Sequence, residues 1–276
     1  MDTNHKYISL KNTLRTLKKV VIAYSGGVDS TFLLKVAVDV LGSENVVCCL
    51  GVSPSLAKSQ KQTALEMAEV IGVDVRQVTV SELEDASYSA NKADRCFHCK
   101  SHLFGLLRKI ADDEGIENVI CGSNFDDLDD YRPGNRAAKA LDVTAPLMEA
   151  ELTKNEIRQL STQLGLKTAK MPATPCLASR VSYGVEITEK KLKQIDQAED
   201  YLRTLGFVEF RVRHHGNTAR IEVHEEDIQK VIQHKNEILT KLKSIGFKYI
   251  ALDLQGFRSG SLNESLSEQE KQKNNR

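Results

Sequence analysis

Long apolar runs are missing from this 276-residue sequence. A membrane-spanning helix needs about 20 consecutive apolar residues, and no segment approaches that length, so no such helix is expected. The first six residues, MDTNHK, also lack the apolar stretch of a signal peptide. We therefore expect a cytoplasmic protein with no membrane partner.

An excess of charge of either sign is missing too, since 38 Lys and Arg balance 38 Asp and Glu. No overall field draws the chain to nucleic acid or to an anionic membrane, so any anion site must be local. A nucleic-acid partner is therefore not expected.

Six cysteines are present. In a chain that is not secreted, cysteines serve first as free thiols, as ligands of a metal or cluster, or as catalysts, and only then as disulfides. Cys48, Cys49 and Cys121 lie in or at the end of predicted strands, where a thiol is usually a small core residue.

Alternating strand and helix patterns predict an α/β fold: a doubly wound parallel sheet over residues 1–168, with a smaller α+β domain over residues 169–258 for substrate binding and assembly. Residues 259–276 have no periodic apolar positions and are expected to be a disordered tail. In the first domain, the predicted strands are 19–24, 46–52, 73–80 and 118–121, and the predicted helices are 29–41, 59–71, 100–114 and 154–164. In the second, helices are predicted at 188–205 and 226–242, and strands at 208–213, 219–223 and 249–254. Thr153 and Thr188 are the predicted N-caps of the helices that they begin. A turn is predicted at residues 216–217, and the flanking His214 and His215 are expected to be exposed.

Residues 25–30, SGGVDS, close a predicted strand and open a predicted helix. Two glycines let the backbone turn sharply and present successive N–H groups at a helix N-terminus, which favours phosphate. Ser25 and Ser30 add hydroxyl donors, and Asp29 is suited to hold magnesium. The segment lacks the Lys of a Walker A loop. The alternative is a plain glycine turn capped by Asp29.

This loop resembles the signature of the PP-loop ATP pyrophosphatase superfamily, whose fold is adenine nucleotide alpha hydrolase-like. Members adenylate a substrate and release pyrophosphate. The superfamily contains NAD and GMP synthetases and tRNA thiolases, so the loop alone does not choose between adding nitrogen and adding sulfur.

Four further segments resemble the LarE family of ATP-dependent sulfur transferases, and the resemblance spans about residues 7–260. It implies a role in nickel-pincer cofactor synthesis, in which the carboxylates of pyridinium-3,5-biscarboxylic acid mononucleotide become thiocarboxylates. The segments are RCFHCK at 95–100, GSNFDD at 122–127, YRPG at 131–134 and TPCLASR at 174–180.

The resemblance also implies roles for individual residues. Lys100 would neutralise the leaving pyrophosphate. Cys176 would attack the acyl-adenylate as a thiolate, assisted by Ser179 and Arg180, and Arg180 is expected to lower the pKa of its thiol. In the sacrificial version of the family, Cys176 then loses its sulfur and becomes dehydroalanine. The residues assigned to ATP and its magnesium are Ser25, Gly26, Gly27, Val28, Asp29, Ser30 and Asn124.

Cys96 and Cys99, spaced C-x2-C, allow a second route. Together with Cys176 they supply the three thiolates of a [4Fe-4S] cluster with one open iron, which could carry a transferable sulfide. The third ligand is placed only by the resemblance. A reducible disulfide, or a zinc knuckle completed by His98 or His102, remains an alternative.

Two groups of residues are candidates for substrate binding. Arg211 and Arg213 flank Val212 and share one strand face, where they can bind the substrate phosphate or simply meet solvent. The second group, at the carboxyl ends of the sheet strands, lines the substrate cleft or is ordinary surface charge; it comprises Asp127, Arg132 and Arg136.

Two other functions remain open. A tRNA thiolase would use similar chemistry but would need a basic RNA-binding module, and a nucleotide-sensing protein would bind ATP without turnover. Family analogy suggests a homo-oligomer, with a hexamer as one form, and a sulfur-delivery partner is a further candidate.

Overall fold

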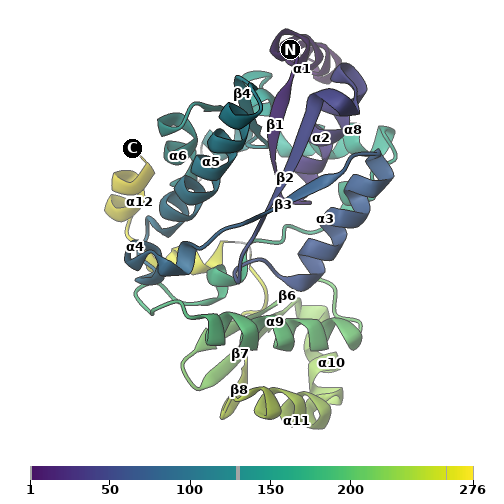
Figure 1. The fold of residues 1–276 in the computed structure, drawn as a ribbon. Helices are drawn as coiled ribbons and strands as arrows, with labels where there is room; N and C mark the ends of the chain where they lie inside the picture. Colours follow the sequence, from purple (N-terminus) through teal and green to yellow (C-terminus); the bar gives the residue numbers. More distant parts are fainter. Residues whose placement is uncertain (1, 129–130, 259, 276) are drawn as a thin grey trace.

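A computed structural model describes residues 2–128, 131–258 and 260–275. Five parallel strands form the larger sheet in the order β3-β2-β1-β4-β5, which confirms the predicted doubly wound α/β fold (Figure 1). These strands are β1 (Val20–Tyr24), β2 (Val46–Val52), β3 (Val75–Thr79), β4 (Asn118–Cys121) and β5 (Val143–Thr144).

Helices cover both faces of this sheet. Val20 and Ile22 of β1 pack into one apolar cluster, and Val21 between them packs into another, because side chains alternate across a strand. The first cluster is covered by α1 (Thr3–Leu17), α2 (Val28–Leu41), α3 (Lys58–Ile71), α7 (Pro146–Glu149) and α8 (Lys154–Gln163), and the second by α5 (Arg95–Asp113) and α6 (Gly134–Ala140). Short α4 (Ala86–Ser89) precedes α5.

The strand order changes direction at β1, whose neighbours are β2 and β4. In open α/β sheets a ligand binds in the crevice at such a switch point, outside the carboxyl ends of the strands. The loop at residues 25–30 follows β1, and residues 122–124 follow β4. The two segments are in close contact, because a Cβ atom on Gly122 would lie 2.9 Å from the backbone nitrogen of Ser30.

A second, smaller sheet has the order β6-β7-β8, with β6 and β7 antiparallel around the predicted turn at residues 216–217 (Figure 1). The structure divides the predicted helix over 226–242 into α10 and α11, with His234 between them. The elements of this part are α9 (Glu189–Thr204), β6 (Phe210–His215), β7 (Thr218–Val223), α10 (Ile228–Gln233), α11 (Lys235–Ile245) and β8 (Tyr249–Leu252). The boundary at residue 168 stays a prediction.

Helix α5 begins at Arg95, five residues before the predicted start at Lys100. The segment between them has no apolar periodicity, so the pattern gave no helix signal. Tertiary contacts hold it instead, since Arg95 is buried and Phe97 packs against the core. The correction matters because Cys96 and Cys99 stand on a helix, three residues apart and on one face.

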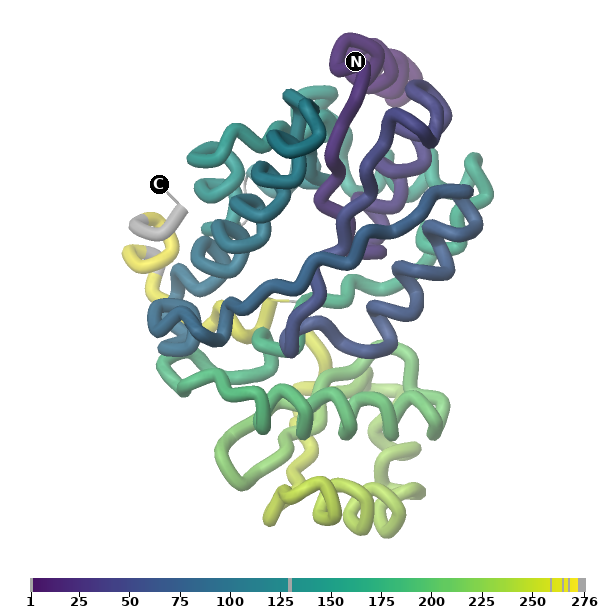
Figure 2. Tube along the Cα trace, viewed as in Figure 1, coloured from purple at the N-terminus to yellow at the C-terminus, as the bar shows by residue number. Residues whose placement is uncertain are grey.

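Helical elements are present among the described residues after 258, where the sequence predicts a disordered tail. A 3-10 helix spans Ser261–Ser265 and α12 spans Glu268–Asn275, the yellow end of the tube in Figure 2. Asn263 accepts a hydrogen bond from Tyr183 and Leu266 is buried. Such distant partners leave no periodic mark on the sequence. Across the described ranges, no helix is long and apolar enough to cross a membrane.

Candidate functional site

The loop after β1 is shaped for an anion. Gly26 has φ +73°, and Gly27 is the N-cap of the 14-residue helix α2. Ser30 folds back across the loop, where its hydroxyl accepts from the Ser25 backbone N–H at 3.2 Å and lies 3.0 Å from the Ser25 hydroxyl. The loop therefore joins a sharp turn and two hydroxyls to the positive end of a helix, as phosphate binding requires.

Replacing Gly26 with Ala tests this turn. A Cβ there would lie 2.6 Å from the Cβ of Ala64 and 2.7 Å from its Cα. We expect the left-handed φ to cost about 1–2 kcal/mol and the overlap to add about 1–3 kcal/mol. Gly165→Ala is the control, since Gly165 has φ +71° with nothing within 4 Å. Urea denaturation should show the larger loss for Gly26→Ala, and equal losses would contradict the close packing.

Asp29 lies at the start of α2 and meets a cation that sequence reasoning missed. The ammonium of Lys154 is 2.6 Å from Asp29 Oδ2, while the buried Oδ1 has no hydrogen-bond partner among the described residues. Burial raises the pKa of Asp29 and the nearby Asp127 carboxylate raises it further, against the opposing effect of Lys154. Lys154 directly follows Thr153, whose predicted role as the N-cap of α8 is confirmed, together with its capping box. Its place at the start of a helix was the only sequence signal that Lys154 gave.

Asn124, a predicted ATP residue, is buried beside these carboxylates. Its backbone N–H donates to Asp127 Oδ2 at 3.1 Å, and its side-chain oxygen accepts from the backbone N–H of Asp126 at 3.0 Å. Arg132 pairs with Asp127 Oδ1 at 3.1 Å. The structure thus brings two of the predicted substrate residues to the predicted ATP residues.

Lys100 and Arg136 lie where α5 meets α6. Lys100 packs so closely that a Cβ on Gly134 would lie 2.4 Å from its Cδ. The guanidinium of Arg136 stands 4.8 Å from the centre of the Phe97 ring, within cation–π range. Both cations therefore belong to the α5–α6 surface.

Cys96, Cys99 and Cys176 share one neighbourhood, although 77 positions separate Cys99 from Cys176. Cys99 and Cys176 pack against the same apolar cluster, and each of the three thiols is close enough to the others to affect their ionisation. Glu82 is fully buried beside Cys99, and neither of its carboxylate oxygens has a hydrogen-bond partner in the described chain. The cysteine site thus comprises three thiols and a carboxylate: Cys96, Cys99, Cys176 and Glu82.

The structure confirms neither the cluster nor its two alternatives. Cys96 and Cys99 are free thiols. His98 and His102 face carboxylates rather than thiols, since His102 is 3.0 Å from Asp85 and His98 is 3.4 Å from Asp94. Among the residues that the structure describes, no three His, Cys, Asp or Glu side chains are placed to hold a single metal ion. The remaining cysteines lie in the core, as predicted; they are Cys48, Cys49 and Cys121.

Arg180 anchors the segment that carries Cys176. Its Nη1 donates to the carbonyls of Pro175 at 2.6 Å and Cys176 at 3.1 Å, and to the Ser179 hydroxyl at 2.8 Å. The rest of the guanidinium makes a two-point ion pair with Glu199, at 2.9 and 3.1 Å, and both side chains are 1% exposed. Arg180 and Ser179 therefore fix the backbone around Cys176.

Arg180 acts to lower the pKa of Cys176, as expected, and so does Arg95. Burial outweighs both charges and raises the pKa of this thiol above its ordinary value. A buried thiolate loses its hydration, which the two cations do not replace. At neutral pH Cys176 is a thiol in this state of the protein.

The pH dependence of alkylation measures this effect. Because the pKa of Cys176 is raised by folding, its thiolate appears at higher pH than that of a free cysteine. We expect the iodoacetamide rate at Cys176, followed by peptide mass mapping, to reach half its maximum at higher pH in the folded protein than in urea. Coinciding profiles would contradict the burial effect. A shift to lower pH would show that the charge of Arg180 outweighs burial at Cys176.

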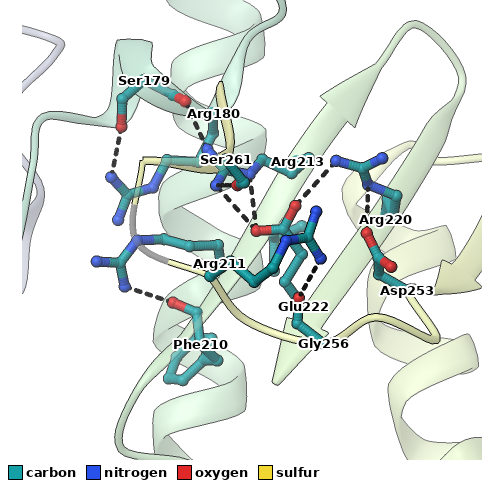
Figure 3. A network of polar contacts seen from close by, with 12 residues as sticks. Ser179, Arg180, Phe210, Arg211, Arg213, Arg220, Glu222, Asp253, Gly256 and Ser261 are labelled. Atoms are coloured by element: carbon teal, nitrogen blue, oxygen red, sulfur yellow. Dashed lines mark hydrogen bonds and ion pairs between the residues drawn. The ribbon is translucent and has the colours of Figure 1, made fainter. Parts of the chain in front are cut away.

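Arg211 and Arg213 do not form a solvent-facing pair, since they are only 8% and 7% exposed. Arg211 donates to the carbonyls of Phe210 and Ala173, at 2.6 and 2.7 Å. Arg213 pairs with Glu222 and donates to the Ser179 carbonyl at 2.8 Å (Figure 3). These contacts place both arginines against the backbone of the segment that carries Cys176. His214, expected to be exposed, is also buried.

Comparison with known proteins identifies the family. Residues 3–102 match the NAD synthase family model. A protein of uncharacterised function from Synechocystis is 44% identical over 95% of this chain and 98% of its own. The pyridinium-3,5-bisthiocarboxylic acid mononucleotide synthase of Lactiplantibacillus plantarum is 36% identical over 95% of each chain. An uncharacterised Methanocaldococcus jannaschii protein is 31% identical over 92% of this chain and 98% of its own. The chain therefore belongs to the LarE family of the PP-loop ATP pyrophosphatase superfamily.

Proposed function

We propose that this protein is an ATP-dependent sulfur transferase that adenylates the carboxylates of pyridinium-3,5-biscarboxylic acid mononucleotide and converts them to thiocarboxylates. The match to the Lactiplantibacillus plantarum synthase carries the proposal, because it covers 95% of both chains and is not limited to the ATP-binding part. The NAD synthase match supports the ATP chemistry over residues 3–102.

The first half-reaction belongs to the loop after β1. Its backbone N–H groups and the hydroxyls of Ser25 and Ser30 bind the β and γ phosphates. A substrate carboxylate oxygen attacks the α phosphorus, the bond to the bridging oxygen breaks, and pyrophosphate leaves. Lys100 and Lys154 are the cations that can offset the charge on the leaving group.

Magnesium fits the carboxylates beside the loop. Asp29 offers a buried oxygen without a hydrogen-bond partner in the described chain, and Asp127 lies near enough to raise the pKa of Asp29. Hard carboxylate oxygens suit Mg²⁺, which usually keeps several waters and binds one or two protein carboxylates. When bound, it would neutralise phosphate charge. The ammonium of Lys154 occupies part of this proposed magnesium position, because it contacts Asp29 Oδ2.

The second half-reaction belongs to Cys176. The Cys176 thiol releases its proton to solvent, its sulfur attacks the acyl carbon, and AMP leaves with the bonding electrons, which gives a thioester. On the sacrificial route, a proton then leaves the Cα of Cys176 while its Cβ–S bond breaks. The sulfur departs with the substrate as a thiocarboxylate, and dehydroalanine remains in the chain. Arg180 and Ser179 hold the Cys176 backbone for both steps.

A [4Fe-4S] cluster is the alternative sulfur source, with Cys96, Cys99 and Cys176 as its ligands. The three thiols of this one neighbourhood fit a cluster in kind and number. When bound, it would supply an iron that carries exchangeable sulfide. On this route the chain orders its three thiols and Cys176 is retained.

The substrate phosphate is assigned to Arg211 and Arg213. Their guanidinium groups adjoin the Cys176 segment through the carbonyls of Ala173 and Ser179, so an anion bound there lies near the sulfur. Asp127, Arg132 and Arg136 are proposed to line the other side of the substrate cleft.

Assembly and location complete the proposal. We assign the smaller sheet with α9, α10 and α11 to the assembly of a homo-oligomer, with a hexamer as one form. A cytoplasmic location follows from the chemistry, because free reactive thiols need a reducing compartment. On the cluster route, a sulfur-delivery partner must reload the protein.

The intact mass of anaerobically purified protein tests the function. It is measured before and after incubation with ATP, Mg²⁺ and the biscarboxylate mononucleotide, while pyrophosphate and thiocarboxylate are scored in the same tubes. Loss of one hydrogen sulfide from the chain in step with product establishes the sacrificial route. Product without mass loss establishes the cluster route. No acid-dependent pyrophosphate release at all would reject the proposed function.

A further inference from the structure

Arg95 is a cation enclosed by protein, with 3% of its surface exposed. An arginine this buried is normally paired with a carboxylate, because an isolated buried charge is costly. In the described part of the chain no carboxylate pairs with Arg95, and its Nε–H has no hydrogen-bond partner. Arg95 directly precedes Cys96 in the chain and donates a hydrogen bond to the segment that carries Cys176. This buried cation therefore lies beside the thiols without an ion pair to a carboxylate in the described chain.

The hydrogen bonds of Arg95 join two distant parts of the chain. Its Nη1 donates to Asn91 Oδ1 at 2.5 Å and to the carbonyl of Ala178 at 3.0 Å. Ala178 follows Cys176 by two residues, while Arg95 directly precedes Cys96 on α5. One guanidinium thus connects the backbone beside Cys176 to the helix that carries the other two thiols.

Asn91 extends this connection. It is fully buried, and its Nδ2 donates to the carbonyls of Val181, Ser182 and Val185, the last two at 2.8 and 2.9 Å. It has φ +52°, a left-handed conformation that Asn tolerates better than most residues. Asn91 and Arg95 together therefore bind the backbone carbonyls of the segment that follows Cys176.

We infer that Arg95 is a positioning residue that holds Cys176 opposite Cys96 and Cys99, so that sulfur transfer depends on it while adenylation does not. The inference rests on the proposed function and adds a residue to it. It applies to either sulfur source, because both need the Cys176 sulfur in a fixed place. Nothing in the adenylation half-reaction uses the contacts of Arg95.

The planar guanidinium explains why this position holds Arg rather than Lys. Arg95 reaches Asn91 and Ala178 with one nitrogen, while its Cζ atom lies 5.3 Å from the centre of the Tyr183 ring. An ammonium on a flexible stem keeps the charge but not the fixed fork or the stacking surface. Arg95→Lys should therefore retain part of the function that Arg95→Gln loses.

The first arm of the test separates the two half-reactions. Arg95→Gln should leave substrate-dependent ATP–pyrophosphate exchange within about twofold of wild type and lower thiocarboxylate formation about 100-fold, as a misplacement of about 1 Å can do. Arg95→Lys should fall between. Arg108→Gln is the matched control, because Arg108 lies on the same helix and also binds loop carbonyls, those of Glu117, Leu141 and Asp142. It should change neither reaction.

The second arm needs no activity. A short bifunctional maleimide is added to reduced protein without ATP, and the Cys99–Cys176 cross-link is quantified by peptide mass mapping. We expect about a tenfold lower yield in Arg95→Gln and an unchanged yield in Arg108→Gln. If Arg95→Gln does not fold by circular dichroism, Arg95→Lys decides both arms.

Equal loss of both half-reactions with an unchanged cross-link would overturn the inference, because it would show a purely structural role. Unchanged sulfur transfer in folded Arg95→Gln would overturn it as well. If wild type shows no acid-dependent pyrophosphate exchange, the proposed function has failed, and the cross-link alone then decides whether Arg95 positions the thiols.

Discussion

Cys176→Ala should abolish thiocarboxylate formation while ATP binding and acid-dependent pyrophosphate release remain. The expected split follows from the structure, because the loop that binds phosphate is built from residues 25–30 and its hydrogen bonds in the described chain do not involve the Cys176 segment. An alanine removes the sulfur that attacks the adenylate on the sacrificial route and binds the cluster on the other. Thiocarboxylate is measured by mass spectrometry and pyrophosphate by a coupled assay.

Cys96→Ala and Cys99→Ala distinguish the sacrificial route from the cluster route in the same experiment. On the sacrificial route each variant should still give up to one product sulfur per chain, whereas on the cluster route each should be as inactive as Cys176→Ala. Cys49→Ala is the control, since Cys49 is fully buried in the sheet core and should affect only stability. Normal product from Cys176→Ala would remove Cys176 from both routes.

The larger sheet could be predicted because its strands carry their own signal. Buried parallel strands read as short apolar runs, and Val46–Val52 matches its predicted bounds at both ends. The predicted caps Thr153 and Thr188 are confirmed for the same reason, since a capping hydroxyl acts on residues three positions away. Local physics leaves local evidence in the sequence.

The surroundings of Cys176 could not be predicted, because tertiary contacts create them. Arg95, Lys154 and Glu199 meet their partners across long stretches of chain, and each looks like ordinary surface charge in the sequence. Arg211 shows the same limit, since alternation placed it correctly on a strand face but could not tell that the face is buried. The resemblance named Cys176, but the structure shows what holds it.

Arg180→Met should cause the largest loss of stability, about 3–5 kcal/mol at neutral pH, because it leaves the 1% exposed Glu199 carboxylate without its main partner. The remaining contacts are weaker: the Val212 N–H at 3.1 Å and the half-exposed Arg203 at 3.6 Å. Urea denaturation with circular dichroism measures the loss.

The pH dependence of the stability loss in Arg180→Met identifies the unpaired Glu199 carboxylate as its cause. Burial raises the pKa of Glu199, but the charge and hydrogen bonds of Arg180 overcome it and hold the pKa below its ordinary value. In wild type this carboxylate therefore contributes stability above the unfolded pKa of about 4.3, and that stability is lost as pH falls through the folded pKa. Without Arg180, burial should raise the pKa of Glu199. The deficit of Arg180→Met should then shrink as pH falls from 7 towards 5, because a neutral carboxyl tolerates burial.

The double variant Arg180→Met with Glu199→Gln separates the lost ion pair from lost packing. Removing both charges takes away the uncompensated carboxylate, so most of the stability should return. Sulfur transfer should not return with it, since Gln at 199 does not replace the donors that Arg180 gives to the carbonyls of Pro175 and Cys176. A stable but inactive double variant would show that the buried pair exists to shape the Cys176 backbone. A stable and fully active one would show that the backbone keeps its shape without Arg180.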